Sequence, residues 1–152
     1  MGKMRVGLVG VGLMGHGIGR NVLAKGFPLS VLAHKNRAPV ESLVGLGAEE
    51  AKSLADLLSS SDLVILCVTG TPQVEQLVYG EGGIAVSGKQ GLIIADCSTA
   101  EPHSTIKIAA VLKAKGIALH DTPMTRTPKE AEAGKLGLMT GGDAAELAKL
   151  MP

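Results

Sequence analysis

The chain has 152 residues, of which 45% are hydrophobic and 19% are charged, and its formal net charge is +1. This length suits one well-cored domain, 1–152, and is short for two. The charge gives no reason to expect binding to nucleic acid or a membrane surface, and no apolar run is long enough to cross a bilayer. No signal-peptide cleavage pattern follows the start, and Cys67 and Cys97 are too few for a disulfide framework, so we expect a soluble cytoplasmic protein.

Short aliphatic runs alternate with segments of helical character along the chain. Nearly continuous apolar strands imply burial on both faces, so the pattern predicts an α/β fold, a doubly wound, mostly parallel sheet with helices on both faces. Helices are expected at Met14–Lys25 and His103–Lys115, with further helix starts at Thr71 and at Thr127, where Glu130 completes a capping box. Strands are expected at Arg5–Val9, Leu29–Leu32, Leu63–Val68, Leu92–Ala95, Ala118–Leu119 and Leu136–Met139.

A glycine-rich stretch, VGLVGVGLMGHG, follows the first expected strand and opens the first expected helix. Gly10, Gly12 and Gly15 have the G-x-G-x-x-G spacing that lets a backbone approach a pyrophosphate at a helix N-terminus. The alternative is an ordinary turn in a chain that has 21 glycines. Gly17 and Gly19 lie inside the helix, where glycine is unfavourable, and we expect them to allow close packing on the sheet.

The residues after the second expected strand indicate which dinucleotide is bound. Many dinucleotide sites carry a carboxylate there that binds the ribose hydroxyls, but the first forty residues contain neither Asp nor Glu. Lys35, Asn36 and Arg37 stand at this place instead, and such cations and amide donors suit a 2′-phosphate. We therefore expect NADP(H) to be preferred, with NAD(H) possible. The alternative is that Lys35 and Arg37 are solvated loop charges.

Four segments together resemble the β-hydroxyacid dehydrogenase family, which includes 3-hydroxyisobutyrate dehydrogenase, tartronate semialdehyde reductase and sulfolactaldehyde reductases. They are VGLVGVGLMGHGIGRNVLAKGFPLSVLAHKNR, LCVTGTPQVEQLVYGEGGI, IIADCSTAEP and DTPMTRTPKEAEAGKLGLMTGGD, which follow the family's order over the whole chain. The resemblance implies a Rossmann-type NAD(P)-binding domain of the 6-phosphogluconate dehydrogenase superfamily. It also implies hydride exchange between NAD(P) and a β-hydroxy acid, a semialdehyde or a 2-oxo acid.

The family's functional positions can be carried over to this sequence. The resemblance matches Ser98 and Thr99 to a pair near the nicotinamide and substrate, and a cap on the helix near His103 is an alternative role that is compatible with it. Thr69 stands where the family often has proline, which leaves its role open. The resemblance implies cofactor contacts from Gly10, Val11, Gly12, Leu13, Met14, Lys35, Asn36, Arg37, Val68, Thr69, Thr71, Val74 and Thr99. It implies substrate contacts from Ser98, Thr125, Arg126 and Thr127.

The family commonly has Ser-Gly-Gly where this chain has Thr125, Arg126 and Thr127. A loop that enters a capped helix presents free amides to an anion, and Arg126 adds a planar charged group that can grip a carboxylate, phosphate or sulfonate. Sulfolactaldehyde reductases look similar at this point, so we expect a small anionic substrate. The alternative is that Arg126 pairs with Glu130 or Glu132 at the surface.

The family's second, helical domain supplies the catalytic lysine, and this chain has no counterpart to it. We therefore expect the cofactor-binding half of a dehydrogenase, which binds cofactor without turnover and has no catalytic residue of its own. The longer parent is expected to be a homo-oligomer. The histidines and cysteines lack the spacing of a metal site. The competing interpretation is a stand-alone NAD(P)-binding or sensor module without catalysis.

Overall fold

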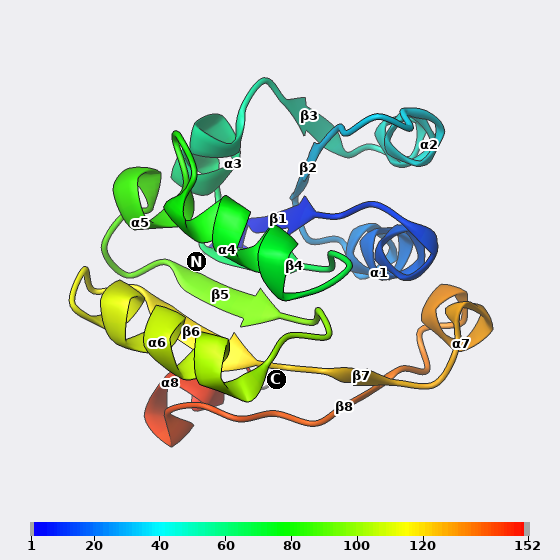
Figure 1. Ribbon diagram of the computed structural model, residues 1–152. Helices are drawn as coiled ribbons and strands as arrows, with labels where there is room; N and C mark the ends of the chain where they lie inside the picture. The colour runs from blue at the N-terminus through cyan, green and yellow to red at the C-terminus, as the bar shows by residue number, and fades with distance from the viewer. Residues whose placement is uncertain (1, 151–152) are drawn as a thin grey trace.

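A computed structural model of the protein describes residues 2–150, so both ends of the expected 1–152 domain lie outside the described residues. Its centre is a six-stranded parallel sheet in the order β3-β2-β1-β4-β5-β6 (Figure 1). The chain winds outward in both directions from β1 and β4, so the expected Rossmann-type fold is confirmed. The strands are β1 (Val6–Val9), β2 (Leu29–Leu32), β3 (Glu49–Ala51), β4 (Leu63–Leu66), β5 (Ile93–Asp96) and β6 (Ala118–Asp121).

Helices cover both faces of the sheet, because alternate residues of the strands point to opposite faces and both sets are aliphatic. One core cluster joins the central strands to α3, α4, α5 and α6, and the other joins β1 and β2 to α1 and α2. No described helix is long and apolar enough to cross a membrane. The helices are α1 (Leu13–Ala24), α2 (Ala38–Gly45), α3 (Leu54–Ser60), α4 (Thr71–Tyr79), α5 (Ile84–Ser87), α6 (Pro102–Lys113), α7 (Pro128–Glu132) and α8 (Ala144–Ala148).

The sequence did not indicate strand β3, which lies at one edge of the sheet. Glu49 and Glu50 are exposed and do not form the aliphatic run that marks a buried strand. An edge strand has one neighbour, here β2, and tolerates polar side chains that water can reach. The aliphatic pattern that reveals buried strands is therefore absent from β3. This strand brings the carboxylate of Glu50 close to the end of β2.

The expected strand Leu136–Met139 is shorter than predicted and does not join the main sheet. It is β8 (Gly137–Leu138), which pairs antiparallel with β7 (Met124–Thr125) in a separate two-stranded ribbon. Figure 1 shows this ribbon leaving the end of β6 and carrying the chain to α7, beside α1. The ribbon thus returns a late segment of the chain to the first helix.

The two glycines inside α1 have different neighbours. A Cβ atom on Gly19 would lie 2.6 Å from Leu43 of α2 and 3.2 Å from Leu8 of β1, so this helix does pack closely there. A Cβ atom on Gly17 would lie 2.6 Å from the backbone of Ala131 in α7. The expectation of packing on the sheet is therefore wrong for Gly17, whose neighbour is another helix.

An ion pair joins the amino ends of β1 and β4. The carboxylate of Asp62 accepts hydrogen bonds from the backbone amide of Arg5 at 2.9 Å and from its guanidinium at 2.7 and 3.1 Å. Because Arg5 donates these bonds, the pKa of Asp62 falls from 3.8 to about 2. This carboxylate therefore stabilises the fold while it is ionised.

We expect an Asp62→Asn variant to be less stable than the unsubstituted protein at pH 7, with the difference narrowing as the pH falls from about 4 to about 2. The sign follows from the lowered pKa, since the folded protein then binds fewer protons than the unfolded chain in this range. Urea unfolding at several pH values measures it. A stability gap that is the same at pH 7 and pH 2 would contradict this role.

Candidate functional site

The glycines of the loop between β1 and α1 have three different environments. Gly10 has φ +96°, and a Cβ atom there would overlap the carbonyl oxygen of Cys67. A Cβ atom on Gly15 would overlap the carbonyl oxygen of Gly10. A Cβ atom on Gly12, by contrast, would meet nothing within 4 Å. Gly10 thus permits the turn, Gly15 permits helix and strand to approach, and Gly12 leaves an open face.

That open face lies at the N-terminus of a twelve-residue helix. Gly12 is the N-cap of α1, no side chain caps it, and the first turn holds no acidic residue. The unpaired amides and the positive end of the helix dipole therefore favour a bound anion. Leu13 is 80% exposed and Met14 is half-buried, so side chains beside the loop remain accessible. Val11 is half-buried and packs against the core cluster under α1.

The basic segment after β2 is partly occupied by internal contacts. The guanidinium of Arg37 donates two hydrogen bonds to the carboxylate of Glu50, at 3.0 and 2.9 Å, and lies 3.4 Å from Glu41. The neighbouring carboxylate of Glu50 raises the pKa of Arg37. Asn36 uses its side-chain oxygen to accept the amide of Ala38 at 3.2 Å. Lys35 is exposed and forms no ion pair within residues 2–150.

Glu50 belongs to β3, the strand that the sequence did not indicate. Its carboxylate stands near the end of β2, although no acidic residue occurs in the first forty residues. The positive charge at the end of β2 is therefore lower than the sequence predicted, and Lys35 supplies most of what remains.

Residues after β4 have mixed exposure. Val68 is half-buried and Thr69 is exposed, whereas Val74 is only 2% exposed and packs in the core, which leaves its side chain little surface for a cofactor. Helix α4 begins at Thr71, as expected, and its N-cap is Gly70. The Thr71 hydroxyl accepts the amide of Glu101 at 2.8 Å and so links this loop to the next one.

The segment after β5 is held by a buried aspartate. Asp96 accepts the backbone amide of Ser98 at 2.9 Å, and the hydroxyl oxygen of Ser98 accepts the amide of Val68 at 3.0 Å. Burial raises the pKa of Asp96, with the Ser98 hydrogen bond acting against it. Neither Ser98 nor Thr99 caps α6, whose N-cap is Glu101, so that alternative is wrong. Ser98 is 3% exposed, whereas Thr99 is exposed.

The loop between β7 and α7 places Arg126 in an unusual conformation. Among residues 2–150, Arg126 is the only non-glycine residue with positive φ, at 83°. Its guanidinium forms no ion pair with a carboxylate of residues 2–150, although its charge is the smallest of the influences that lower the pKa of Glu130. The alternative of a surface pair with Glu130 or Glu132 is therefore wrong.

The capping box at Thr127 is present, and it changes the expected anion site. Glu130 accepts the amide of Thr127 at 3.0 Å and also the Thr127 hydroxyl. These bonds lower the pKa of Glu130. The Thr125 hydroxyl donates to the carbonyl of Gly137 at 3.3 Å. The capping carboxylate thus takes the Thr127 amide, which reduces the free amides expected at this loop, and the Arg126 guanidinium remains available to an anion.

Three loops meet at the carboxyl edge of the sheet. The β1 loop contacts the β4 loop through Gly10 and Cys67, and the β4 loop contacts the β5 loop through Val68 and Ser98. The segment after β2 leaves from the same edge (Figure 1). The Arg126 loop comes from beyond β6 and is tied to α1 through α7. The sequence assigned no role to Asp96 or Asn21, because their partners depend on which strands and helices become neighbours.

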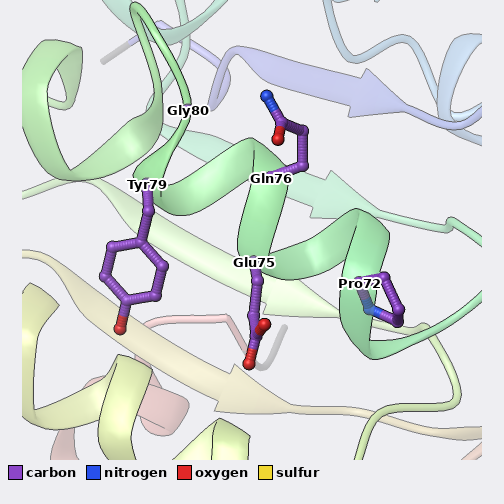
Figure 2. A pocket seen from close by; sticks show the side chains of 5 residues that line it. All are labelled: Pro72, Glu75, Gln76, Tyr79 and Gly80. Atoms are coloured by element: carbon purple, nitrogen blue, oxygen red, sulfur yellow. The ribbon is translucent and has the colours of Figure 1, made fainter.

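A surface hollow on α4 lies apart from most of these residues. Glu75, which points toward α6 in Figure 2, accepts the hydroxyl of Ser104 at 2.7 Å. Residues 2–150 contain no cluster of His, Cys, Asp and Glu that could hold a metal ion. The hollow is lined by Pro72, Glu75, Gln76, Tyr79 and Gly80.

Known proteins resemble this chain over nearly all of its length. The NAD-dependent L-serine dehydrogenase of Pseudomonas aeruginosa is 34% identical over 148 residues, which are 97% of this chain and 49% of that protein. The 3-sulfolactaldehyde reductase of Escherichia coli is 30% identical, with 97% and 49% covered. The crystal structure of 3-hydroxyisobutyrate dehydrogenase from Salmonella typhimurium superposes with a TM-score of 0.89 at 28% identity, covering 97% of this chain and 51% of that one.

The chain therefore spans about half the length of these relatives. The sequence pattern of the NAD binding domain of 6-phosphogluconate dehydrogenase matches residues 5–152. That match covers the strands, the glycine loop and the Arg126 loop described above. The chain belongs to the family of NAD-binding domains typified by 6-phosphogluconate dehydrogenase.

Proposed function

We propose that this chain is the cofactor-binding half of an NAD(P)-dependent oxidoreductase that acts on a small anionic hydroxy acid, semialdehyde or 2-oxo acid. The observation that carries the proposal is the open face of Gly12 at the start of α1, between a tight turn at Gly10 and a close contact at Gly15. These are the three glycine roles of a pyrophosphate cradle. When bound, the nicotinamide supplies the hydride acceptor or donor.

The chain's own residues would bind and orient the reactants. Gly10 to Met14 would hold the pyrophosphate, and the exposed Thr69 and Thr99 lie on the loops that meet beside it. Ser98 is 3% exposed and is held by the Val68 amide and by its hydrogen bonds to Asp96, so it would support the site from beneath and keep the β4 and β5 loops in place beside the reactants. The group that transfers the substrate proton would lie in the half that this chain does not include, as the family resemblance implies.

The preference for NADP(H) over NAD(H) rests mainly on Lys35 and Asn36. The Asn36 amide nitrogen remains a donor, since only the side-chain oxygen bonds Ala38. Arg37 could contribute by exchanging its Glu50 partner for a phosphate, because that ion pair is exposed and such pairs are weak.

Titration of the chain with NADPH and NADH at low salt tests both parts of the proposal. We expect NADPH to bind at least about tenfold more tightly than NADH, a difference of about 1.4 kcal/mol. Isothermal titration calorimetry measures both dissociation constants. If surface cations bind the 2′-phosphate of NADPH, a higher salt concentration should reduce the difference between the two dissociation constants. Tighter binding of NADH would refute the preference, and no binding of either would refute the cofactor role.

The substrate class follows from Arg126. The left-handed backbone of Arg126 costs stability, and such strain is found where a side chain is needed in a fixed place. The relative named 3-sulfolactaldehyde reductase acts, by its name, on a sulfonated aldehyde. A sulfonate or carboxylate on a short hydroxylated chain is therefore the ligand that we propose for Arg126.

The second candidate function is a stand-alone NAD(P)-binding or sensor module. A sensor needs no substrate loop, yet this chain retains the strained Arg126 and a buried Ser98 that is held by Asp96. These features favour the oxidoreductase. The homo-oligomer expected for a longer parent is part of the same proposal.

A further inference from the structure

The side chain of Asn21 on α1 bonds the end of helix α7, which follows the Arg126 loop. The carboxamide nitrogen of Asn21 donates to the carbonyl of Ala131 at 2.9 Å and to that of Glu132 at 3.2 Å, and it also contacts the carbonyl of Gly17 in its own helix at 2.8 Å. The last carbonyls of a helix lack partners within the helix. Asn21 thus caps the end of α7 from a neighbouring helix.

The fit between the two helices leaves little freedom of position. At Gly17 the backbones approach so closely that a Cβ atom would lie 2.6 Å from both the carbonyl carbon of Ala131 and the amide nitrogen of Glu132. Gly134, at φ +67°, lies against the carboxamide oxygen of Asn21, where a side chain would collide. The surface of α1 that contacts α7 therefore fits closely on both sides of the Asn21 side chain, at Gly17 and at Gly134.

Charged contacts at the outer edge of the helix pair support the same arrangement. Glu132 of α7 contacts His16 at 2.7 Å and Arg20 at 3.0 Å, both on α1. His16 also contacts the hydroxyl of Ser42 on α2 at 3.0 Å. The Arg20 contact is exposed and adds little, whereas the His16 contact is partly buried, as the amide bonds of Asn21 are.

The position of α7 determines the position of Arg126. Thr127 directly follows Arg126 and is bonded to Glu130 in the first turn of α7 through both its amide and its hydroxyl. Arg126 is therefore the direct neighbour of the bonded N-cap Thr127 on one side and, on the other, of Thr125, whose hydroxyl bonds the Gly137 carbonyl. A shift of α7 would move the guanidinium with it.

We propose that Asn21 is a positioning residue for Arg126: by fixing α7 on α1, it sets the anion-binding guanidinium at a constant distance from the dinucleotide loop at the other end of α1. The inference rests on the proposed function, in which Arg126 holds the substrate anion. In this proposal α1 has two roles. Its first residue, Leu13, adjoins the dinucleotide loop, and Asn21, eight residues later, anchors the helix that follows the Arg126 loop. Asn21 itself touches neither ligand.

An Asn21→Asp variant tests the inference, because a carboxylate cannot donate and is repelled by the carbonyl oxygens of Ala131 and Glu132. Its control is Gln90→Glu, the same amide-to-carboxylate change at an exposed residue. Gln90 lies just before the amino end of β5, whereas the glycine loop follows the carboxyl end of β1. Amide proton–nitrogen spectra of both variants report the loop without any ligand. In the unsubstituted chain, Arg126 should give the strong intraresidue amide-to-Hα cross-peak of a left-handed residue.

We expect Asn21→Asp to shift the amide resonances of Arg126 and Thr127 and to weaken that cross-peak. The dissociation constant for NADP⁺ should stay within about twofold of the unsubstituted value, while 2-hydroxyethanesulfonate, used as the anion probe, should bind at least about tenfold more weakly. Gln90→Glu should change none of these. If Asn21→Asp does not fold, Asn21→Ala removes the donor without adding a charge and should produce the same pattern with smaller shifts.

Two outcomes would overturn the inference. Unchanged Arg126 resonances in Asn21→Asp or Asn21→Ala would show that α7 is held by other contacts. An equal loss of NADP⁺ and anion binding would make Asn21 a residue of the general fold. If the unsubstituted chain binds NADP⁺ but not 2-hydroxyethanesulfonate, the substrate role of Arg126 fails, and the ligand-free spectra still decide whether Asn21 positions the loop.

Discussion

A Gly12→Ala variant should fold like the unsubstituted chain and bind NADP⁺ at least about tenfold more weakly, a loss of at least about 1.4 kcal/mol. The reason is that a Cβ atom at Gly12 meets no protein atom within 4 Å and projects into the space where a pyrophosphate would approach the backbone. Alanine is a poorer N-cap than glycine, so stability should fall by no more than about 1 kcal/mol. Calorimetric titration and urea unfolding give the two quantities.

Gly45→Ala is the matched control for this experiment. Gly45 is the last residue of α2, and a Cβ atom there also meets nothing within 4 Å, but it lies away from the glycine loop. This variant should keep the NADP⁺ affinity of the unsubstituted chain. Unaltered affinity in Gly12→Ala would place the pyrophosphate elsewhere, and the proposed function would lose its main support.

Removing the Arg126 side chain should abolish most anion binding and leave the cofactor unaffected. We expect Arg126→Ala to weaken binding of 2-hydroxyethanesulfonate and of 3-hydroxypropanoate to the NADP⁺-loaded chain at least about tenfold. These two probes differ only in the anionic group, so their ratio in the unsubstituted chain tells a sulfonate site from a carboxylate site. Proton–nitrogen spectra of the Thr125–Thr127 amides follow the titrations.

Arg126→Gly separates the role in binding from the cost in stability. This variant should lose anion binding as Arg126→Ala does. Because glycine relieves the left-handed strain at φ 83°, its free energy of unfolding should be higher than that of Arg126→Ala by roughly 1 kcal/mol. Lys107→Ala, which removes an exposed cation from α6, should change neither property. Retained anion affinity in both Arg126 variants would assign the anion to another group.

The sites proposed for the two ligands are connected through helix α1. The glycine loop begins α1, and the Arg126 loop is fixed to the same helix through α7. Between them, Ser98 is held by Asp96 and by the amide of Val68. An arrangement of this kind can hold a nicotinamide and a short anionic substrate in a fixed relation, which is the main requirement for hydride transfer.

The sequence alone determined the fold and the cofactor loop. Aliphatic strand runs with intervening helices predict a parallel sheet, because each such strand must be covered on both faces. The spacing of Gly10, Gly12 and Gly15 predicts the turn and the helix start, since those conformations depend on residues close together in the chain. The capping box at Thr127 was readable for the same local reason.

The tertiary structure decided which of the predicted polar groups remain available. Arg37 was a candidate for a phosphate, but an edge strand brings Glu50 to it. The loop before α7 was expected to present free amides, and Glu130 accepts one of them, that of Thr127. Gly17 was expected to face the sheet and instead faces α7, where Asn21 caps a helix 110 residues further along the chain. Turns and helix starts are fixed by neighbours in sequence, whereas the partner of a charged or amide side chain is fixed by which distant elements the packed core brings beside it.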